Sequence, residues 1–449
     1  MITVSVNPKH TIKPIKPMHA AGQPPFGGGF LKFDFSYIRH LKNAKMPYAR
    51  LHDVNGAFGG NRFVDVPNIF RDFDADENDP ASYDFAFTDA LLAAMQEYDI
   101  KPIYRLGVTI ENQANFRSYR IDPPKDFHKW ARVCEHIIRH YNEGWANGFH
   151  YGIEYWEIWN EPENGATVET NQMWTGTAQQ FYELYDVTTK HLKKCFGDTV
   201  KVGGYGSCGF YGVYYHPDKY GVSVPQREKD HRYDKDVYRV EFFLGFMEYI
   251  REKGSPIDFF TWHSYSDVEK TLVMDEFLHK TLKEYGYEGL ETHLNEWNNA
   301  HEGRLHGTGY AAAAAAGMML AFQNAHTDML CYYDTRLQAS TYGGFFAPLT
   351  YEPVATYYAF AAFGRLYQLG TQAEAVVTGA EGEFYALCAT DGKKNALMLV
   401  NRTGEKQDLA LEGADMDHAQ IHLIDTGRLL SMAFEADAIA NDTILLIEW

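Results

Sequence analysis

The residues best suited to chemistry are two glutamates, Glu161 and Glu296, each of which ends a short apolar segment and stands beside an asparagine. Glu161 lies in YWEIWNEPE (155–163) and Glu296 in ETHLNEWNN (291–299). The apolar positions suit strands that are buried on both faces, and Pro162 would end the first strand. A turn-capping Asn-Glu pair or a solvated acid at a strand end would explain either segment alone. Two such segments in one chain favour a shared site.

Paired carboxyl groups have a well-defined use in the hydrolysis of glycosides. A retaining glycosidase holds two of them about 5 Å apart. One attacks the anomeric carbon, and the other protonates the leaving oxygen. The fold must therefore bring Glu161 and Glu296 face to face.

The elements that could do this alternate along the chain. Short β-branched and aromatic runs are separated by helical patterns, which favours a parallel sheet wrapped by helices. A weak pattern at 17–22 predicts a first strand, and clearer patterns predict seven more, at 46–53, 101–106, 155–161, 200–206, 258–265, 292–297 and 329–334. Eight strands over about 350 residues predict an α/β fold, a (β/α)₈ TIM barrel with insertions. The two glutamates would then end strands four and seven and face each other across the barrel.

A doubly wound sheet is the rival fold. The glycine run at 27–29 lacks the strand–turn–helix context of a phosphate-binding loop, so we prefer the barrel. Long connections at 55–85 and 207–235 would lie on the carboxyl face of the barrel, where such loops usually shape a site. The alanine run at 311–316 predicts a helix that packs closely against its neighbours.

The pattern changes after about residue 369. Short strands separated by turns are predicted at 383–390, 395–401, 420–424 and 443–447, which is typical of a small accessory β-sandwich. We therefore expect a catalytic barrel over 15–369 and a β-sandwich over 370–449, to which 1–14 adds a strand. A structural companion to the barrel is favoured over a separate binding module.

Composition narrows the function classes. The formal net charge is −19 and the pI is near 5.4, so a nucleic-acid or membrane partner is not expected. The five cysteines are odd in number, and no two stand at metal-ligand spacing, which indicates reduced structural thiols. The N-terminal segment lacks the apolar core of a signal peptide. We expect a cytoplasmic protein unless a secretion signal has been removed; the oligomeric state stays open, a homo-oligomer included.

The two glutamate segments resemble those of clan A glycoside hydrolases, most closely glycoside hydrolase family 39, the family of β-xylosidases and α-L-iduronidases. YARLHDV (48–54) is similar to that family's strand-two motif, with Leu51 in place of phenylalanine, and IDFFTWHSY (257–265) resembles its strand-six segment. The likeness runs from about residue 18 to residue 369. It is more specific for the clan than for the family.

The resemblance implies a role for each matching residue. Glu161 would be the acid/base, with a raised pKa, and Glu296 the nucleophile, kept ionised. Asn160 would bind the 2-hydroxyl of the sugar, and His52 the rest of the glycone. Arg50 would sit below the nucleophile and hold it charged. The resemblance places His263 and Tyr265 between the two glutamates.

Three further substrate contacts are predicted from position alone. Trp297 adjoins the nucleophile, and Tyr333 lies with Asp334 and Arg336 at the end of strand eight. Arg105 is unusual in a barrel strand; it either binds a substrate carboxylate or hydroxyl or pairs with a core acid. Strands three and eight depart from the family pattern, which leaves the sugar open, an acidic one included.

The expected function is a retaining exo-glycosidase of the β-xylosidase kind that hydrolyses oligosaccharides or glycosides without a cofactor or metal. An endo-acting glycanase of the same clan and a non-catalytic carbohydrate-binding relative are the alternatives. A metal-dependent hydrolase with ligands such as His52, Asp53, His263 and Glu296 is less favoured, because no strand shows His-X-His.

Overall fold

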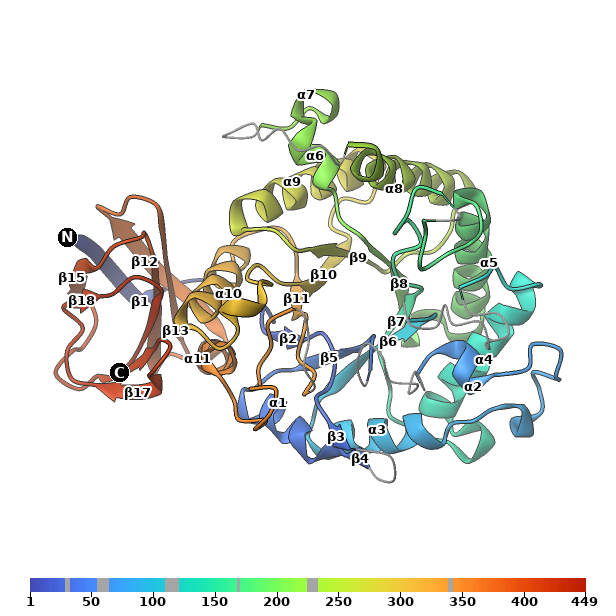
Figure 1. Ribbon diagram of the computed structural model, residues 1–449, viewed down its shortest axis with the longest axis horizontal. Coiled ribbons are helices and arrows are strands. Elements are labelled where there is room, and N and C mark those ends of the chain that lie inside the picture. Colours follow the sequence, from blue (N-terminus) through green and yellow to red (C-terminus); the bar gives the residue numbers. More distant parts are fainter. Residues whose placement is uncertain (29–32, 55–63, 110–120, 168–169, 224–232, 338–341) are drawn as a thin grey trace.

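The computed structural model describes residues 1–449 except 29–32, 55–63, 110–120, 168–169, 224–232 and 338–341. A closed barrel of eight parallel strands forms its larger part, and a sheet of nine strands lies beside it (Figure 1). The expected TIM barrel is therefore confirmed. No described helix has both the length and the apolar character needed to cross a membrane.

The barrel strands follow one another around the barrel in chain order, and each is parallel to its neighbours. They are β2 (Ala20–Ala21), β5 (Tyr48–Leu51), β6 (Lys101–Leu106), β7 (Tyr155–Ile158), β8 (Lys201–Ser207), β9 (Phe259–Ser264), β10 (Glu291–Trp297) and β11 (Met329–Tyr332). Strand β7 is the fourth and β10 the seventh, as the sequence predicted. All carboxyl ends lie at one end of the barrel, where enzymes of this fold carry their sites.

Helices cover the outside of the barrel (Figure 1). The longer ones are α3 (Ala86–Glu97), α4 (Phe127–Glu143), α5 (Ala178–Phe196), α8 (Tyr233–Lys253), α9 (Val268–Glu284), α10 (Gly309–Phe322) and α11 (Ala355–Leu369), and a short α1 (Arg39–Asn43) precedes them. Several begin at a side chain that caps the free backbone N–H groups. Thr177 and Gln180, for example, form a reciprocal capping box at the start of α5.

The long connections carry short helices where they are described. Helix α2 (Val66–Ile69) follows the second barrel strand, and α6 (Tyr211–Tyr215) and α7 (Pro217–Tyr220) follow the fifth. The parts of these connections at 55–63 and 224–232 lie outside the described residues. A small ribbon of β3 (Gly27–Gly28) and β4 (Phe33–Asp34) lies between the first barrel strand and α1.

The strands of the second sheet come from both ends of the chain. They are β1 (Ile2–Pro14), β12 (Thr371–Thr378), β13 (Glu383–Thr390), β14 (Asn395–Arg402), β15 (Gln407–Glu412), β16 (Gln420–Ile424), β17 (Leu429–Ala433), β18 (Ala438–Ile439) and β19 (Thr443–Glu448). Strand β1 pairs antiparallel with β12 and parallel with β15. The predicted accessory sandwich thus takes the form of one curled sheet with its own core.

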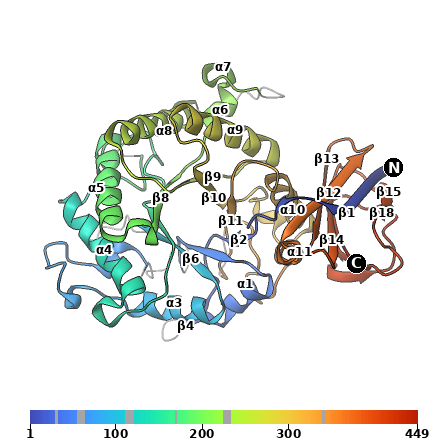
Figure 2. The ribbon, with the colours of Figure 1, turned by 180° about the vertical axis from the view of Figure 1, so that it is seen from behind.

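Alternation along the strands explains how this sheet buries both faces. In β14, Leu397 and Leu399 point into the core enclosed by the curl, whereas Met398 and Val400 join the core of the barrel side. Helices α10 and α11 cover that second face, as the views from opposite sides show (Figures 1 and 2). The six alanines at 311–316 of α10 are buried. A Cβ added at Gly317 would lie 2.8 Å from the Tyr385 ring, so small residues allow this close packing.

Candidate active site

Glu161 stands in a turn that the neighbouring strand holds in place. Its backbone N–H donates to the carbonyl of Gly206 at 2.9 Å. Trp159 and Glu161 both have positive φ angles, 71° and 47°, a conformation that side-chain-bearing residues rarely adopt and that collects at functional sites. Buried Glu163 fixes the turn from below, because one of its oxygens accepts from Ser207 Oγ and the Cys208 N–H, each at 2.8 Å. Burial raises the pKa of Glu163 to about 7.

Glu296 lies inside the seventh barrel strand, where the pairing of β10 with β9 shifts between Leu294 and Glu296. The irregularity lets Asn295 as well as Glu296 face the barrel axis. The Glu296 carboxylate accepts from Tyr265 Oη at 2.5 Å and, through its other oxygen, from Arg50 Nη1 at 3.1 Å. It is therefore held at both oxygens.

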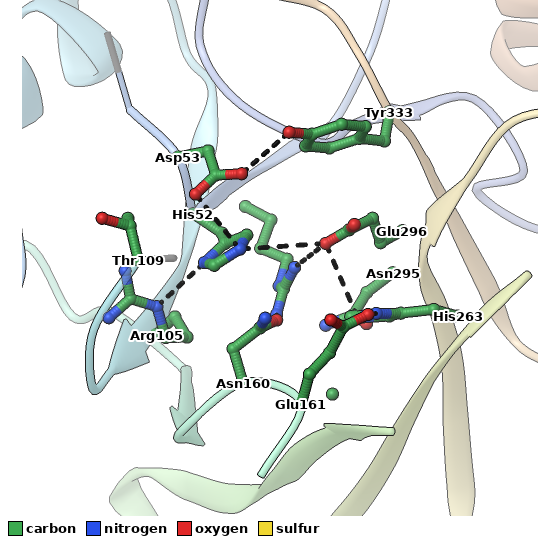
Figure 3. A network of polar contacts seen from close by, with 12 residues as sticks. His52, Asp53, Arg105, Thr109, Asn160, Glu161, His263, Asn295, Glu296 and Tyr333 are labelled. Carbon is green, nitrogen blue, oxygen red and sulfur yellow. Dashed lines mark hydrogen bonds and ion pairs between the residues drawn. The ribbon is translucent and has the colours of Figure 1, made fainter. Parts of the chain in front are cut away.

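His263 lies between the two glutamates (Figure 3). Its Nδ1 is 2.8 Å from Glu161 Oε1, and its Nε2 is 3.8 Å from Glu296 Oε2. One ligand-type atom from each of the three residues falls within 4.8 Å of the others. A carboxylate oxygen of Glu161 is thus at most 4.8 Å from one of Glu296.

Arg50 connects the site to a buried polar layer beneath it. Its guanidinium donates to Glu157 at 2.8 Å, to Asn160 Oδ1 at 2.6 Å and to Glu296. Glu157 is completely buried, yet its pKa is lowered, because the charge and hydrogen bonds of Arg50 outweigh the burial. The other Glu157 oxygen accepts from Thr261 Oγ1 and Asn295 Nδ2, both at 2.7 Å. Every polar atom of this carboxylate is satisfied, as a buried charge requires.

The direction of the pKa shift at Glu161 differs from the sequence expectation. Burial would raise the pKa of Glu161, but the hydrogen bond and the charge of His263 outweigh it and lower the pKa. Burial raises the pKa of Glu296. Burial would lower the pKa of His263, but the two carboxylates raise it. The pKa of Glu161 is thus lowered where the sequence argument expected it to be raised, because His263 stands 2.8 Å from its carboxylate.

His52 and Arg105 form a second buried pair on the other side of Glu296. Arg105 Nε donates to His52 Nδ1 at 3.2 Å, and His52 Nε2 is 3.9 Å from Glu296 Oε2. Burial and the neighbouring cations lower the pKa of His52, so the ring is neutral and carries its proton on Nε2. Arg105 is inaccessible and bonds Asp65 at 2.5 Å. Of its two predicted roles the structure shows the pairing with a core acid, so the predicted substrate contact is wrong.

Tyr333 lies at the rim of the site, as its position at the end of strand eight suggested. Its hydroxyl donates to Asp53 Oδ2 at 2.8 Å and accepts from Arg336 Nη2 at 2.5 Å. The ring lies edge-on to Tyr342 at 5.0 Å, and Tyr342 in turn lies 4.8 Å from the Tyr265 ring. These three rings form an aromatic wall beside Glu296, a surface suited to the apolar face of a sugar.

Trp297 does not belong to the site, which corrects its predicted substrate contact. Adjacent strand residues face opposite sides, so Trp297 points outward where Glu296 points inward. Its fully buried ring packs on Phe360 of α11 at 6.2 Å and on Tyr332 at 5.0 Å. Asn160, by contrast, faces the centre. Its Oδ1 is taken by Arg50, while its Nδ2 has no hydrogen-bond partner among the residues the structure describes.

The structure therefore brings together Glu161, Glu296, Asn160, Arg50, His52, His263, Tyr265 and Tyr333, and it adds Asp53, Glu157, Asn164 and Tyr342. Asn164 donates to Glu161 Oε2 at 2.6 Å. Glu157 and Asn164 flank the motif around Glu161, so proximity in sequence was an available signal for them. Nothing in the sequence marked Tyr342. The Glu161–His263–Glu296 cluster has the spacing of a metal site, but the Arg50 cation already neutralises Glu296.

Comparison with known proteins agrees with this geometry. The family described as glycosyl hydrolases family 39 matches residues 4–313, well over half of the chain. The chain belongs to glycosyl hydrolase family 39. The protein is therefore a glycoside hydrolase. The match ends before the last barrel strand, where the sequence departs from the family pattern.

Solved structures similar to this family 39 chain share its fold over their whole length. A glucosidase from Croceicoccus marinus is 19% identical, with a TM-score of 0.76, and the match covers 100% of this chain and 98% of that one. A GH39 β-xylosidase from Caulobacter crescentus is 14% identical, with a TM-score of 0.68 and 99% of both chains covered. CelM2, a bifunctional glucanase-xylanase from a metagenome library, is 14% identical, with a TM-score of 0.60 and 100% and 98% covered. No match was found among the curated proteins.

Proposed function

We propose that this family 39 hydrolase is a retaining exo-glycosidase that acts on oligosaccharides or small glycosides by double displacement, with Glu296 as nucleophile and Glu161 as acid/base. The spacing of the two carboxylates supports the retaining mechanism. Their nearest ligand-type oxygens lie within 4.8 Å, whereas an inverting enzyme separates its carboxyl groups by about 6.5–9.5 Å to admit a water molecule.

The surroundings fit the two roles. Glu296 would attack the anomeric carbon while the bond to the leaving oxygen breaks and Glu161 gives that oxygen a proton. Arg50, fixed by Glu157, and the Tyr265 hydroxyl hold the attacking carboxylate. Water would then attack the anomeric carbon of the glycosyl-enzyme ester while Glu161, now a base, takes a proton from that water and the bond to Glu296 breaks.

The proton for the first step would come from the Glu161–His263 pair. His263, whose pKa the two carboxylates raise, would share this proton with Glu161 across their 2.8 Å contact. A sugar bound above Glu296 would exclude water from the cluster. Without water the ionised Glu161 and the protonated His263 are less stable, so the neutral acid and the neutral imidazole are favoured. His263 then acts as a store for the proton that Glu161 delivers.

An exo-acting β-glycosidase is the activity class we favour. Of the three solved structures described above, the glucosidase and the β-xylosidase have the higher TM-scores, 0.76 and 0.68, which supports release of single sugars. Asn160, whose Oδ1 accepts from Arg50, would donate from Nδ2 to the 2-hydroxyl of the bound sugar.

The test is a screen of nitrophenyl glycosides, including β-D-xyloside, β-D-glucoside, β-D-galactoside, α-L-arabinosides and α-L-iduronide. Glu161→Ala and Glu296→Ala are assayed with azide, and Glu291→Gln, a change at the amino end of the same barrel strand as Glu296, is the control. For a β-glycoside, azide should rescue Glu296→Ala with an α-glycosyl azide and Glu161→Ala with a β-glycosyl azide. Full activity of either alanine variant, or interchanged azide products, would refute the assignment.

A further inference from the structure

Outside the catalytic end, one cluster of metal-ligating side chains joins two neighbouring outer helices. Glu135 belongs to α4, and His191 and Cys195 belong to α5. The two helices lie side by side on the wall of the barrel away from the C-terminal sheet (Figures 1 and 2). From the geometry of this cluster we infer that Glu135, His191 and Cys195 form a binding site for a thiophilic divalent cation, Zn²⁺ in the first place.

The spacing within α5 creates half of the site. Residues four apart lie on one face of a helix, and His191 Nε2 is 3.7 Å from Cys195 Sγ. Zinc binds nitrogen at about 2.0 Å and sulfur at about 2.3 Å in a tetrahedron, which places neighbouring ligands about 3.5 Å apart. The imidazole and the thiol are therefore already at the separation that a single zinc ion requires.

Glu135 supplies the third ligand from the facing helix. Its Oε2 lies 2.6 Å from the same His191 Nε2, and the three ligand atoms all fall within 4.8 Å of one another. The cation would replace the proton shared by Nε2 and Oε2 and the proton of the thiol, so binding releases protons. On binding, Glu135 Oε2 and His191 Nε2 would move apart by roughly 1 Å or less to reach the spacing of two ligands in a tetrahedron.

Arg139 orients the carboxylate for this role. Its Nε donates to Glu135 Oε1 at 2.7 Å, which leaves Oε2 to face the histidine and the thiol. Outer partners of this kind commonly fix metal ligands. Arg139 also pairs with Glu143. With the Cys195 thiolate, the two glutamates carry three negative charges, which balance Arg139 and a divalent cation.

Access and ligand type favour zinc over harder cations. The side chains of Glu135 and His191 are 14% and 26% exposed, so an ion can enter from solvent and a water can complete the tetrahedron. A thiolate and an imidazole select zinc and similar soft ions, whereas magnesium and calcium prefer oxygen ligands. The site lies on the helical wall and uses none of the catalytic residues, so hydrolysis does not depend on it.

The test uses Co²⁺ as a spectroscopic substitute for zinc on the full chain. We expect one tight Co²⁺ per chain with a thiolate-to-cobalt band in the near ultraviolet, which Zn²⁺ abolishes by displacement. Cys195→Ser should remove the band, and His191→Gln should weaken Zn²⁺ binding on the order of 10- to 100-fold or more. Hydrolytic activity without added metal should stay unchanged in Cys195→Ser.

Cys208→Ser is the matched control, because Cys208 is the thiol near the other carboxylate–histidine cluster, Asn164 Nδ2 lying 3.9 Å from its Sγ. That variant should keep the band. Absence of the band in the parent protein, its persistence in Cys195→Ser, or its loss in Cys208→Ser alone would overturn the proposal.

Discussion

The carboxyl end of the barrel and the C-terminal sheet each have a buried core, but the two cores contain different kinds of side chain. The sheet encloses leucine, isoleucine and valine, such as Leu397, Leu399, Leu445 and Ile447. The barrel end encloses Arg50, Glu157, Glu296 and His263, each at most 7% exposed. Apolar burial stabilises a fold directly, whereas a buried ion pair roughly balances the cost of its desolvation. The sheet therefore adds to the stability of the fold, whereas the barrel end holds charged groups in fixed positions with little gain in stability.

The largest effect that this contrast predicts is catalytic. Glu296→Ala should lower kcat/KM on the order of 10⁴-fold or more, because the nucleophile is lost. The free energy of unfolding should change less than in Leu445→Ala, a variant of the sheet core, since Arg50 keeps its bond to Glu157. Kinetics and urea denaturation on the same preparation measure both. If Glu296→Ala lost stability but kept its activity, the proposed difference between the barrel end and the sheet would be wrong.

Glu157→Gln should damage both stability and activity, because Glu157 is the ionic anchor of Arg50. Removing one charge of a buried pair costs about 3–5 kcal/mol, and a looser Arg50 should lower kcat. Glu291→Gln is the matched control, since that strand glutamate pairs with Lys201 but is 25% exposed. Glu291→Gln should lower the free energy of unfolding by about 1 kcal/mol or less. Equal costs in the two variants would contradict the account.

Leu445→Ala should act on stability alone. A cavity in the core of the curled sheet costs about 2–5 kcal/mol, while kcat/KM at a temperature where the protein stays folded should be unchanged. Denaturation with a parallel nitrophenyl assay measures the two quantities. A large change in kcat would show that the sheet takes part in the chemistry.

His263→Asn should shift the pH profile. The pKa of His263 is raised above 6.5 by Glu296 and Glu161, so the shared proton is present below that pKa and is lost as the pH rises through it. Without the imidazole the proton can reside only on Glu161, a weaker base. The alkaline limb of kcat/KM should therefore move to lower pH. An unchanged or more alkaline limb would show that His263 does not store the proton.

Trp297→Phe should have the smallest effect on function. The indole packs on Phe360 and its N–H has no hydrogen-bond partner in the described part of the chain, so the change costs about 1–2 kcal/mol of stability. KM for a nitrophenyl glycoside should stay the same. A markedly raised KM would restore the substrate contact predicted from the sequence.

The features that could be predicted from the sequence are those set by short contiguous segments, such as strands and their ends. The strand ends at Glu161 and Glu296 follow from short segments whose apolar run, asparagine and acid are contiguous. The barrel follows from the alternation of strands and helices. Strand β13 was predicted at its observed bounds, because its pattern and flanking turns are all within a dozen residues.

What escaped prediction depends on residues far apart in sequence. The role of Glu157 depends on its ion pair with Arg50, and the role of Arg105 depends on its ion pair with Asp65. Trp297 was misplaced because adjacency to Glu296 in sequence means opposite faces in a strand. The single curled sheet needs the pairing of β1 with β12 and β15, which no local pattern specifies. The lowered pKa of Glu161 depends on His263, which a distant strand contributes.

The most direct test of the central claim is the anomeric configuration of the first product, followed by proton NMR during hydrolysis of whichever nitrophenyl glycoside is turned over. Two carboxylates with oxygens within 4.8 Å of each other fit the spacing of retaining enzymes better than that of inverting ones, so the product should first appear with the configuration of the substrate. A first product of inverted configuration would contradict the account.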